Sequence, residues 1–223
     1  AVAPAFRQHW PEAELVNLMD DSLARDVAVT GLDEVMTSRF LALARYARDV
    51  AGCQGLLFTC SAFGSAIEEV KKQVQTADFP VLKPNEAMME QAIGLSRSAK
   101  AGPVLVFSMF EPTLPSIARE MQEMAGHEGP PLDVRLRFVP RALEALNAGD
   151  EEGCINHIAD FVETAVQQAQ EKGEHPSCVA FAMFSMARGR HATEERLRAA
   201  GCSIPVLTSP DTAVLRMKAL LSK

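Results

Sequence analysis

The chain has 223 residues, of which 48% are hydrophobic, so it is long enough for one large α/β domain or two smaller ones with their own cores. Its formal net charge of -7 and its pI of about 5.3 argue against nucleic acid and anionic membrane surfaces as main partners. A small pocket sets its own local potential, so this charge leaves an acidic substrate open.

The cysteines give no sign of a disulfide framework or a metal site. They form no CxxC pair and no zinc-type cluster with histidine, and an odd number of scattered thiols is typical of a reducing cytoplasm. No apolar run reaches the roughly 18 residues of a transmembrane helix. The first ten residues also lack the pattern of a signal peptide. We therefore expect a cytoplasmic protein without a metal site.

Short apolar or β-branched runs alternate with longer amphipathic stretches along the chain, which predicts a parallel α/β architecture. The expected strands cover residues 14–19, 55–59, 80–82, 104–109, 134–139, 178–183 and 205–208. The expected helices include residues 41–50, 65–74, 117–124, 155–170 and 194–200, with a further helix up to residue 97 and a closing one up to residue 221.

The two halves of the chain resemble each other. In each half a strand ends, a helix follows, and a second strand begins at a proline. Cys60 and Pro80 are 20 positions apart in the first half, and Met183 and Pro205 are 22 positions apart in the second. Matched spacing and matched apolar phase indicate an internal repeat.

The repeat extends upstream of these strands. The segment 4–10 followed by the strand at 14–19 parallels the segment 115–124 followed by the strand at 134–139. The second of these helices is preceded by a strand, and the first is preceded by nothing. We therefore expect one further strand before Ala1, together with any site residue that it carries.

The repeat predicts two pseudosymmetric parallel-sheet α/β domains with the site in the cleft between them. Residues 1–98 plus 210–223 are expected to form the first domain, which carries Cys60. Residues 99–209 are expected to form the second, which carries Met183 and Ser185. Ligands of parallel sheets bind beyond the carboxyl ends of the strands, and pockets favour domain interfaces.

Cys60 stands where an apolar strand meets small residues, Ser61 and Ala62. A helix starting there directs its free N–H groups and positive dipole end toward the thiol and toward an anion beside it. Such a position favours the reactive thiolate. The alternative is a small buried hydrophobic side chain, the role we assign to the other four cysteines.

Three short motifs then resemble the Asp/Glu racemase superfamily, which includes aspartate, glutamate and hydantoin racemases, arylmalonate decarboxylase and maleate isomerase. The motifs are Leu57-Phe58-Thr59-Cys60-Ser61-Ala62, Ala182-Met183-Phe184-Ser185 and Glu111-Pro112-Thr113-Leu114-Pro115-Ser116. The resemblance covers essentially the whole chain in order of elements. It implies two pseudosymmetric α/β domains, a small carboxylate or amino-acid-like substrate, and no metal or pyridoxal cofactor.

The resemblance also implies roles for individual residues. In the two-cysteine racemases of this group, one thiolate takes the α-proton and a second thiol returns a proton on the other face. Cys60 matches the first position and is the expected catalytic residue. The expected substrate contacts are Ser61, Ala62, Ser108, Thr113, Met183, Phe184 and Ser185. For Ser108, Thr113 and Ser116, helix capping is the alternative role.

The sequence departs from the family pattern at three places. Met183 stands at the second cysteine position, and a thioether cannot carry a proton. Ser61-Ala62 replaces the usual Asn-Thr, and Ser185 replaces an acidic residue or histidine. A lone Cys60 can still serve a racemase-like reaction, or a decarboxylase or cis-trans isomerase of the same superfamily.

Two non-enzymatic alternatives stay open, namely a small-molecule binding or sensor protein and a structural homologue in which Cys60 is incidental. The oligomeric state is also open, with a homo-oligomer allowed. Of the arginines that follow the second motif, Arg188 is the better candidate for an anion because it lies closer to the strand end.

Overall fold

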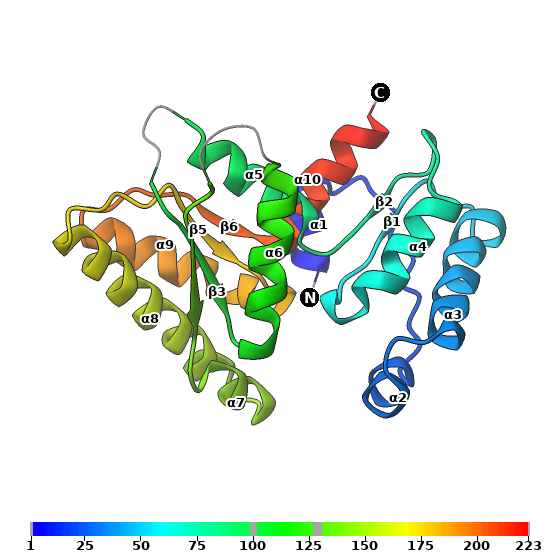
Figure 1. The fold of residues 1–223 in the computed structure, drawn as a ribbon, viewed down its shortest axis with the longest axis horizontal. Helices are drawn as coiled ribbons and strands as arrows, with labels where there is room; N and C mark the ends of the chain where they lie inside the picture. The colour runs from blue at the N-terminus through cyan, green and yellow to red at the C-terminus, as the bar shows by residue number, and fades with distance from the viewer. Residues whose placement is uncertain (1, 99–101, 127–130, 223) are drawn as a thin grey trace. The chain divides into compact units, whose positions relative to one another are not determined.

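A computed structural model describes residues 2–98, 102–126 and 131–222. These residues fall into two compact α/β units. Unit 1 consists of Asn85–Thr212, and unit 2 consists of Val2–Pro84 together with the chain from Ala213 onward. Every strand pair in the two sheets is parallel, so the α/β class predicted from the sequence is confirmed (Figure 1).

Unit 1 is built on a four-stranded sheet with the order β4-β3-β5-β6. Its strands are β3 (Val104–Ser108), β4 (Val134–Phe138), β5 (Cys178–Phe181) and β6 (Val206–Thr208). Val104 of β3 aligns with Val134 of β4 on one side and with Cys178 of β5 on the other. The four strands lie within the ranges expected from the sequence and are shorter by one or two residues.

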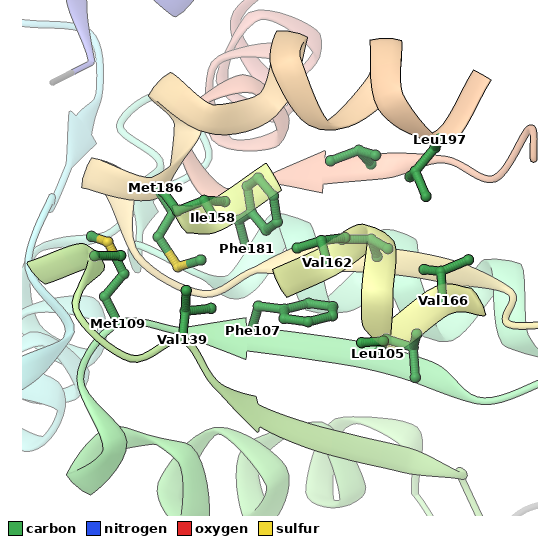
Figure 2. Close-up of a cluster of buried hydrophobic side chains, with 14 of the residues drawn as sticks. Leu105, Phe107, Met109, Val139, Ile158, Val162, Val166, Phe181, Met186 and Leu197 are labelled. Carbon is green, nitrogen blue, oxygen red and sulfur yellow. The ribbon is translucent and has the colours of Figure 1, made fainter. Parts of the chain in front are cut away.

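Helices cover both faces of this sheet. They are α5 (Glu86–Ser96), α6 (Leu114–Ala125), α7 (Ala142–Asn147), α8 (Glu151–Glu171), α9 (Arg190–Ala199) and the start of α10 (Ser209–Leu221). Because side chains alternate along a strand, Leu105 and Phe107 pack with α8, whereas Val104 and Val106 pack with α5 and α6. Figure 2 shows Phe107 and Phe181 meeting edge to face in the first cluster, with ring centroids 6.4 Å apart.

Helix α8 has 21 residues and shows how the sequence determines where a helix begins and which face it buries. Its N-cap Asp150 accepts a hydrogen bond of 2.8 Å from the N–H of Gly153. Cys154, Ile158 and Val162 then bury one face, as their helical spacing predicts. In the part of the chain that the structure describes, no helix is long and apolar enough to cross a membrane.

Unit 2 contains a two-stranded parallel sheet and its own core. Its elements are α1 (Ala3–His9), α2 (Leu23–Thr30), α3 (Glu34–Arg45), β1 (Leu56–Leu57), α4 (Gly64–Val74), β2 (Val81–Leu82) and the remainder of α10. A π-helical turn, Tyr46–Val50, continues α3. The core is formed mainly by the apolar faces of α3 and α4.

Residues 14–19 do not form the strand that their apolar pattern predicted. The segment has no strand pairing, and Leu15, Val16, Leu18 and Met19 are exposed. A strand needs a hydrogen-bonded neighbour, and the corresponding strand of unit 1, β4, has β3 beside it. Residues 2–98 contain no counterpart of β3. The further strand expected before Ala1 remains a prediction.

The same local difference explains why the strand before Cys60 is only half-buried although its residues are apolar. Strand β1 pairs with β2 alone among the described residues, so one of its edges is uncovered. Its counterpart β5 lies between β3 and β6 and is buried throughout.

The compact units differ from the expected domains in the placement of α5. The expected boundary between the two domains lies after residue 98, and the observed one lies before Asn85. The α5 side chains Met88, Met89 and Ile93 belong to the apolar cluster that contains Val104 and Val106. The helix therefore packs on the sheet that follows it in the chain, and unit 1 begins at Asn85. Residues 99–101 lie outside the described part, and the second division falls within α10, between Thr212 and Ala213.

Candidate functional site

Cys60 lies at a strand-to-helix junction in unit 2. Its backbone is extended, with φ -131° and ψ 123°, and it directly precedes a 3₁₀ turn, Ser61–Phe63, which leads into α4. Of the five cysteines, Cys60 alone is exposed. The structure therefore presents this thiol to solvent beside the start of a helix, as the small residues after it predicted.

Aromatic packing on either side fixes the backbone around the exposed thiol. The buried Phe63, three positions after Cys60, packs at a tilt against Phe40 of α3 with ring centroids 4.9 Å apart. Phe58, two positions before Cys60, lies 5.5 Å from the same ring. The N–H of Phe58 also donates to the carbonyl of Leu82 at 3.1 Å. The thiol is accessible, but both flanks of its turn are held by the core.

The other cysteines lie in apolar surroundings. Burial raises the pKa of the Cys178 thiol in β5 to about 12, so it stays protonated at neutral pH. Burial also raises the pKa of Cys154, whose sulfur lies 3.8 Å from the sulfur of Met109. Cys202 is buried and Cys53 is half-buried. This placement agrees with the role of small hydrophobic side chains that we assigned to them.

Met183 occupies the equivalent junction in unit 1. Its backbone is extended, with φ -133° and ψ 137°, and it directly precedes the 3₁₀ turn Phe184–Gly189 and then α9. The Met183 side chain is half-buried, and that of Phe184 is 8% exposed. Ser185 is half-buried, and its carbonyl oxygen accepts a hydrogen bond of 2.9 Å from Nε of Arg188.

The arginines that follow this turn have counter-ions within unit 1. Arg188 pairs with Glu151 at 3.0 Å. Arg190 pairs with Glu194 at 2.8 Å and with Asp211 at 2.9 Å. Arg188 was the preferred arginine for an anion, and an anion there has to compete with a carboxylate already in contact.

Ser108 and Thr113 belong to a third strand end in unit 1, after β3. Ser108 is 0% exposed, and its hydroxyl both donates to the Phe110 carbonyl and accepts from the Phe110 N–H, each at 3.0 Å. Thr113 donates to the same carbonyl at 2.8 Å, and its hydroxyl lies 3.3 Å from that of Ser108. The two predicted residues are therefore brought together.

Helix capping, the alternative role for this loop, is not what these hydroxyls do. Thr113 precedes α6 and makes no side-chain capping bond, and Ser116 donates to the Thr113 carbonyl at 2.8 Å. The proline at position 115 supplies the fixed φ of the first helical turn. The hydroxyls of Ser108 and Thr113 instead fold the loop around Phe110.

A pocket that sequence reasoning missed opens beside this loop. Its volume is about 310 Å³, and it is lined entirely by unit 1, at the carboxyl ends of β3 and β4. One wall comes from the loop that contains Phe110 and Glu111, and the other from Phe138, Arg141 and Glu144 around the start of α7. The only sequence signal was that aromatic and charged residues follow the ends of two strands.

No metal-binding constellation is found in residues 2–98, 102–126 and 131–222. There, no group of three or more histidine, cysteine, aspartate or glutamate side chains is placed to hold a metal ion. His191, which follows the second strand end, is 83% exposed and lies 3.3 Å from Glu195 of its own helix.

Comparison with known proteins identifies the fold. No protein-family model matches the sequence, and no curated protein matches it significantly. Solved structures do match. Glutamate racemase isoform RacE1 from Bacillus anthracis superposes with a TM-score of 0.65 at 12% identity, over 99% of this chain and 76% of the racemase.

Two further solved structures match the same fold. PH1733, an aspartate racemase homologue from Pyrococcus horikoshii, gives a TM-score of 0.64 at 16% identity, over 100% of this chain and 91% of that one. Glutamate racemase from Campylobacter jejuni subsp. jejuni gives 0.54 at 16% identity, over 86% and 70%. The chain therefore shares the α/β fold of these solved structures, which is the fold that the resemblance of its three short motifs implied.

Proposed function

We propose that this protein is a cofactor-independent enzyme of the Asp/Glu racemase type, acting at the carbon alpha to a carboxylate or carbonyl. Cys60 is its acid/base or nucleophilic thiol. The observation that carries the proposal is the position of Cys60, the one exposed cysteine, at a strand-to-helix junction flanked by aromatic packing in a fold shared with solved racemases. A small carboxylate or amino-acid-like molecule is the substrate.

The racemase-like step is a proton transfer. The Cys60 thiolate takes the α-proton, the C–H bond breaks, and its electron pair moves into the adjacent carboxylate or carbonyl to give an enediolate or enolate. The N–H groups at the start of α4 suit an anion beside the thiol. Proton return from the Cys60 thiol regenerates the thiolate, and where water supplies the proton instead, the hydroxide left behind takes the proton from the thiol.

Met183 limits what this step can produce. Its thioether has no proton to deliver, so the proton returns from Cys60 itself or from water. The Cys60 thiol first swaps the abstracted proton for one from solvent. Its return to the same face then exchanges the α-proton without inverting the carbon. We therefore expect exchange with solvent to be faster than racemisation.

Two other reactions suit a lone thiol. In a decarboxylase, the C–C bond to a carboxylate breaks, carbon dioxide leaves, and the enediolate takes its proton from the Cys60 thiol. In a cis-trans isomerase, the thiolate adds to the double bond, the new single bond rotates, and elimination releases the thiolate. In all three reactions Cys60 is indispensable.

A non-catalytic small-molecule binding protein is the second candidate function. Met183 and Ser185 favour it, because they stand where the two-cysteine racemases carry chemistry. This candidate predicts saturable ligand binding that does not depend on the Cys60 sulfur.

The test is a panel of substrates in D₂O followed by NMR. The panel contains amino acids, hydantoins, aryl- and alkylmalonates and maleate, which separates exchange, decarboxylation and isomerisation. Cys60→Ala removes the sulfur with little change in volume, and Cys53→Ala is the matched control because Cys53 is a half-buried cysteine of the same unit.

We expect turnover in the parent chain and in Cys53→Ala, and none in Cys60→Ala. Turnover that survives Cys60→Ala contradicts the mechanism. Saturable binding without turnover, unchanged by Cys60→Ala, supports the binding protein instead.

A further inference from the structure

We propose that the pocket at the carboxyl ends of β3 and β4 binds a small zwitterion with an apolar body, of the chemical class of an aromatic or large aliphatic α-amino acid. The pocket lies within unit 1 and does not contain Cys60, so the proposal goes beyond the proposed function and is independent of it. Its volume of about 310 Å³ is at the small end of ligand sites.

Arg141 supplies the site for a carboxylate. Its backbone has φ 63° and ψ -18°, which makes it the one residue other than glycine with positive φ in the part of the chain that the structure describes. Positive φ is unfavourable for a residue that carries a Cβ atom, so arginine is not favoured at this position by its backbone preference. Among the described residues, its guanidinium has no hydrogen-bond or ion-pair partner. A guanidinium that lines a pocket without such a partner offers paired donors to a carboxylate.

Glu111 and Glu144 supply the site for an ammonium group. Both line the pocket, and neither carboxylate has an ion pair or side-chain hydrogen bond with any described residue. The two glutamates and Arg141 give the lining a net charge of -1. A simple carboxylate is repelled by the two glutamates and a simple amine by the arginine, whereas a zwitterion satisfies both.

Phe110 and Phe138 supply the apolar surface. Phe110 is 46% exposed and Phe138 is 37% exposed, and both line the pocket over the buried Met109. The backbone of Phe110 is held in place by its hydrogen bonds with the Ser108 and Thr113 hydroxyls. Two exposed aromatic rings at one pocket favour a ligand with an apolar group of comparable size.

Three probes with the same apolar body separate the parts of this proposal. They are L-phenylalanine, 3-phenylpropanoate and phenethylamine, each titrated into the full chain and followed by NMR chemical shifts and calorimetry. We expect saturable binding of phenylalanine, and binding about tenfold weaker or worse for each analogue, because each leaves charged pocket groups without a partner. An analogue that binds as tightly as phenylalanine overturns the zwitterion assignment, and no saturable binding of any probe overturns the site.

Variants test the role of Arg141 separately from folding. Arg141→Gly removes the guanidinium, and glycine adopts positive φ without steric cost, so we expect an intact fold and lost binding. Arg141→Gln and Arg119→Gln make the same chemical change at two positions. Arg119→Gln is the control, because Arg119 is exposed on α6 outside the pocket. Unchanged phenylalanine binding in Arg141→Gly overturns the proposal. Cys60→Ala should bind phenylalanine like the parent, so loss there also overturns it.

Discussion

Cys60 and Met183 have the same backbone conformation at equivalent places in the two halves of the chain. Each is an extended residue between a strand and a 3₁₀ turn, with φ and ψ of -131° and 123° for Cys60 and -133° and 137° for Met183. Phe110 repeats the arrangement after β3, with φ -126° and ψ 99°. Among the described residues, this junction therefore occurs three times, with a different side chain on each.

Met183→Cys should therefore place a thiol on a backbone with nearly the same conformation as that of Cys60. If Cys60 works alone, we expect the second thiol to raise racemisation relative to α-proton exchange by about 10²–10⁴-fold, the usual contribution of one general acid or base. Met183→Leu, which keeps the volume without a proton carrier, should leave the ratio unchanged. The measurement compares loss of optical rotation with deuterium incorporation, and equal ratios in both variants contradict a proton-carrying role for this position.

Thiol accessibility gives a second prediction. At pH 8 a bulky maleimide should label Cys60 first, because the other cysteines are buried or half-buried and the pKa of Cys178 is raised to about 12. Mass spectrometry of digested protein identifies the labelled position, and Cys60→Ser should abolish the fast phase. A fast phase on Cys154 or Cys202 instead means that unit 1 opens readily.

Ser108→Ala should destabilise the chain by about 1–3 kcal/mol, because it removes a fully buried hydroxyl and leaves the N–H of Phe110 without its acceptor. Urea unfolding measures the loss. Ser116→Ala removes an exposed hydroxyl from the first turn of α6 nearby and should change stability by less than about 0.5 kcal/mol. Equal effects of the two substitutions would show that the bond to Phe110 contributes little.

Unit 2 should lose stability in acid because the carboxylates that pair with Arg39 become protonated. Hydrogen bonds from Ser22 and Arg39 hold the pKa of Asp20 below its ordinary 3.8, and the bond from Arg39 does the same for Asp26. Lowered carboxyl pKa values stabilise the fold above pH 3.8, and this stability is lost as pH falls through the lowered values.

Arg39→Met should accordingly lower the urea midpoint at pH 7 and shrink the difference between pH 7 and pH 3. Arg119→Met, an exposed position on α6, is the control and should leave the pH difference intact. A parent-like pH difference in Arg39→Met excludes these carboxylates as the source of acid sensitivity.

Local pattern was enough to predict much of this protein. Alternating apolar runs located the strands of unit 1, and helical spacing located α4, α6 and α8, because each element must bury a continuous apolar face. The small residues after Cys60 predicted the sharp turn and the helix beyond it. These are short-range consequences of side-chain size and polarity.

Tertiary structure decided the rest. Residues 14–19 have a strand pattern but no neighbour to pair with, and Met88 on α5 packs on the sheet that follows it in the chain. The pocket at Arg141 joins two strand ends that lie side by side only because β3 and β4 pair. The sequence by itself determined where Cys60 stands and what precedes and follows it, because those are local properties. Which segments pair, and which charged groups meet in a pocket, depends on long-range packing that no local pattern encodes.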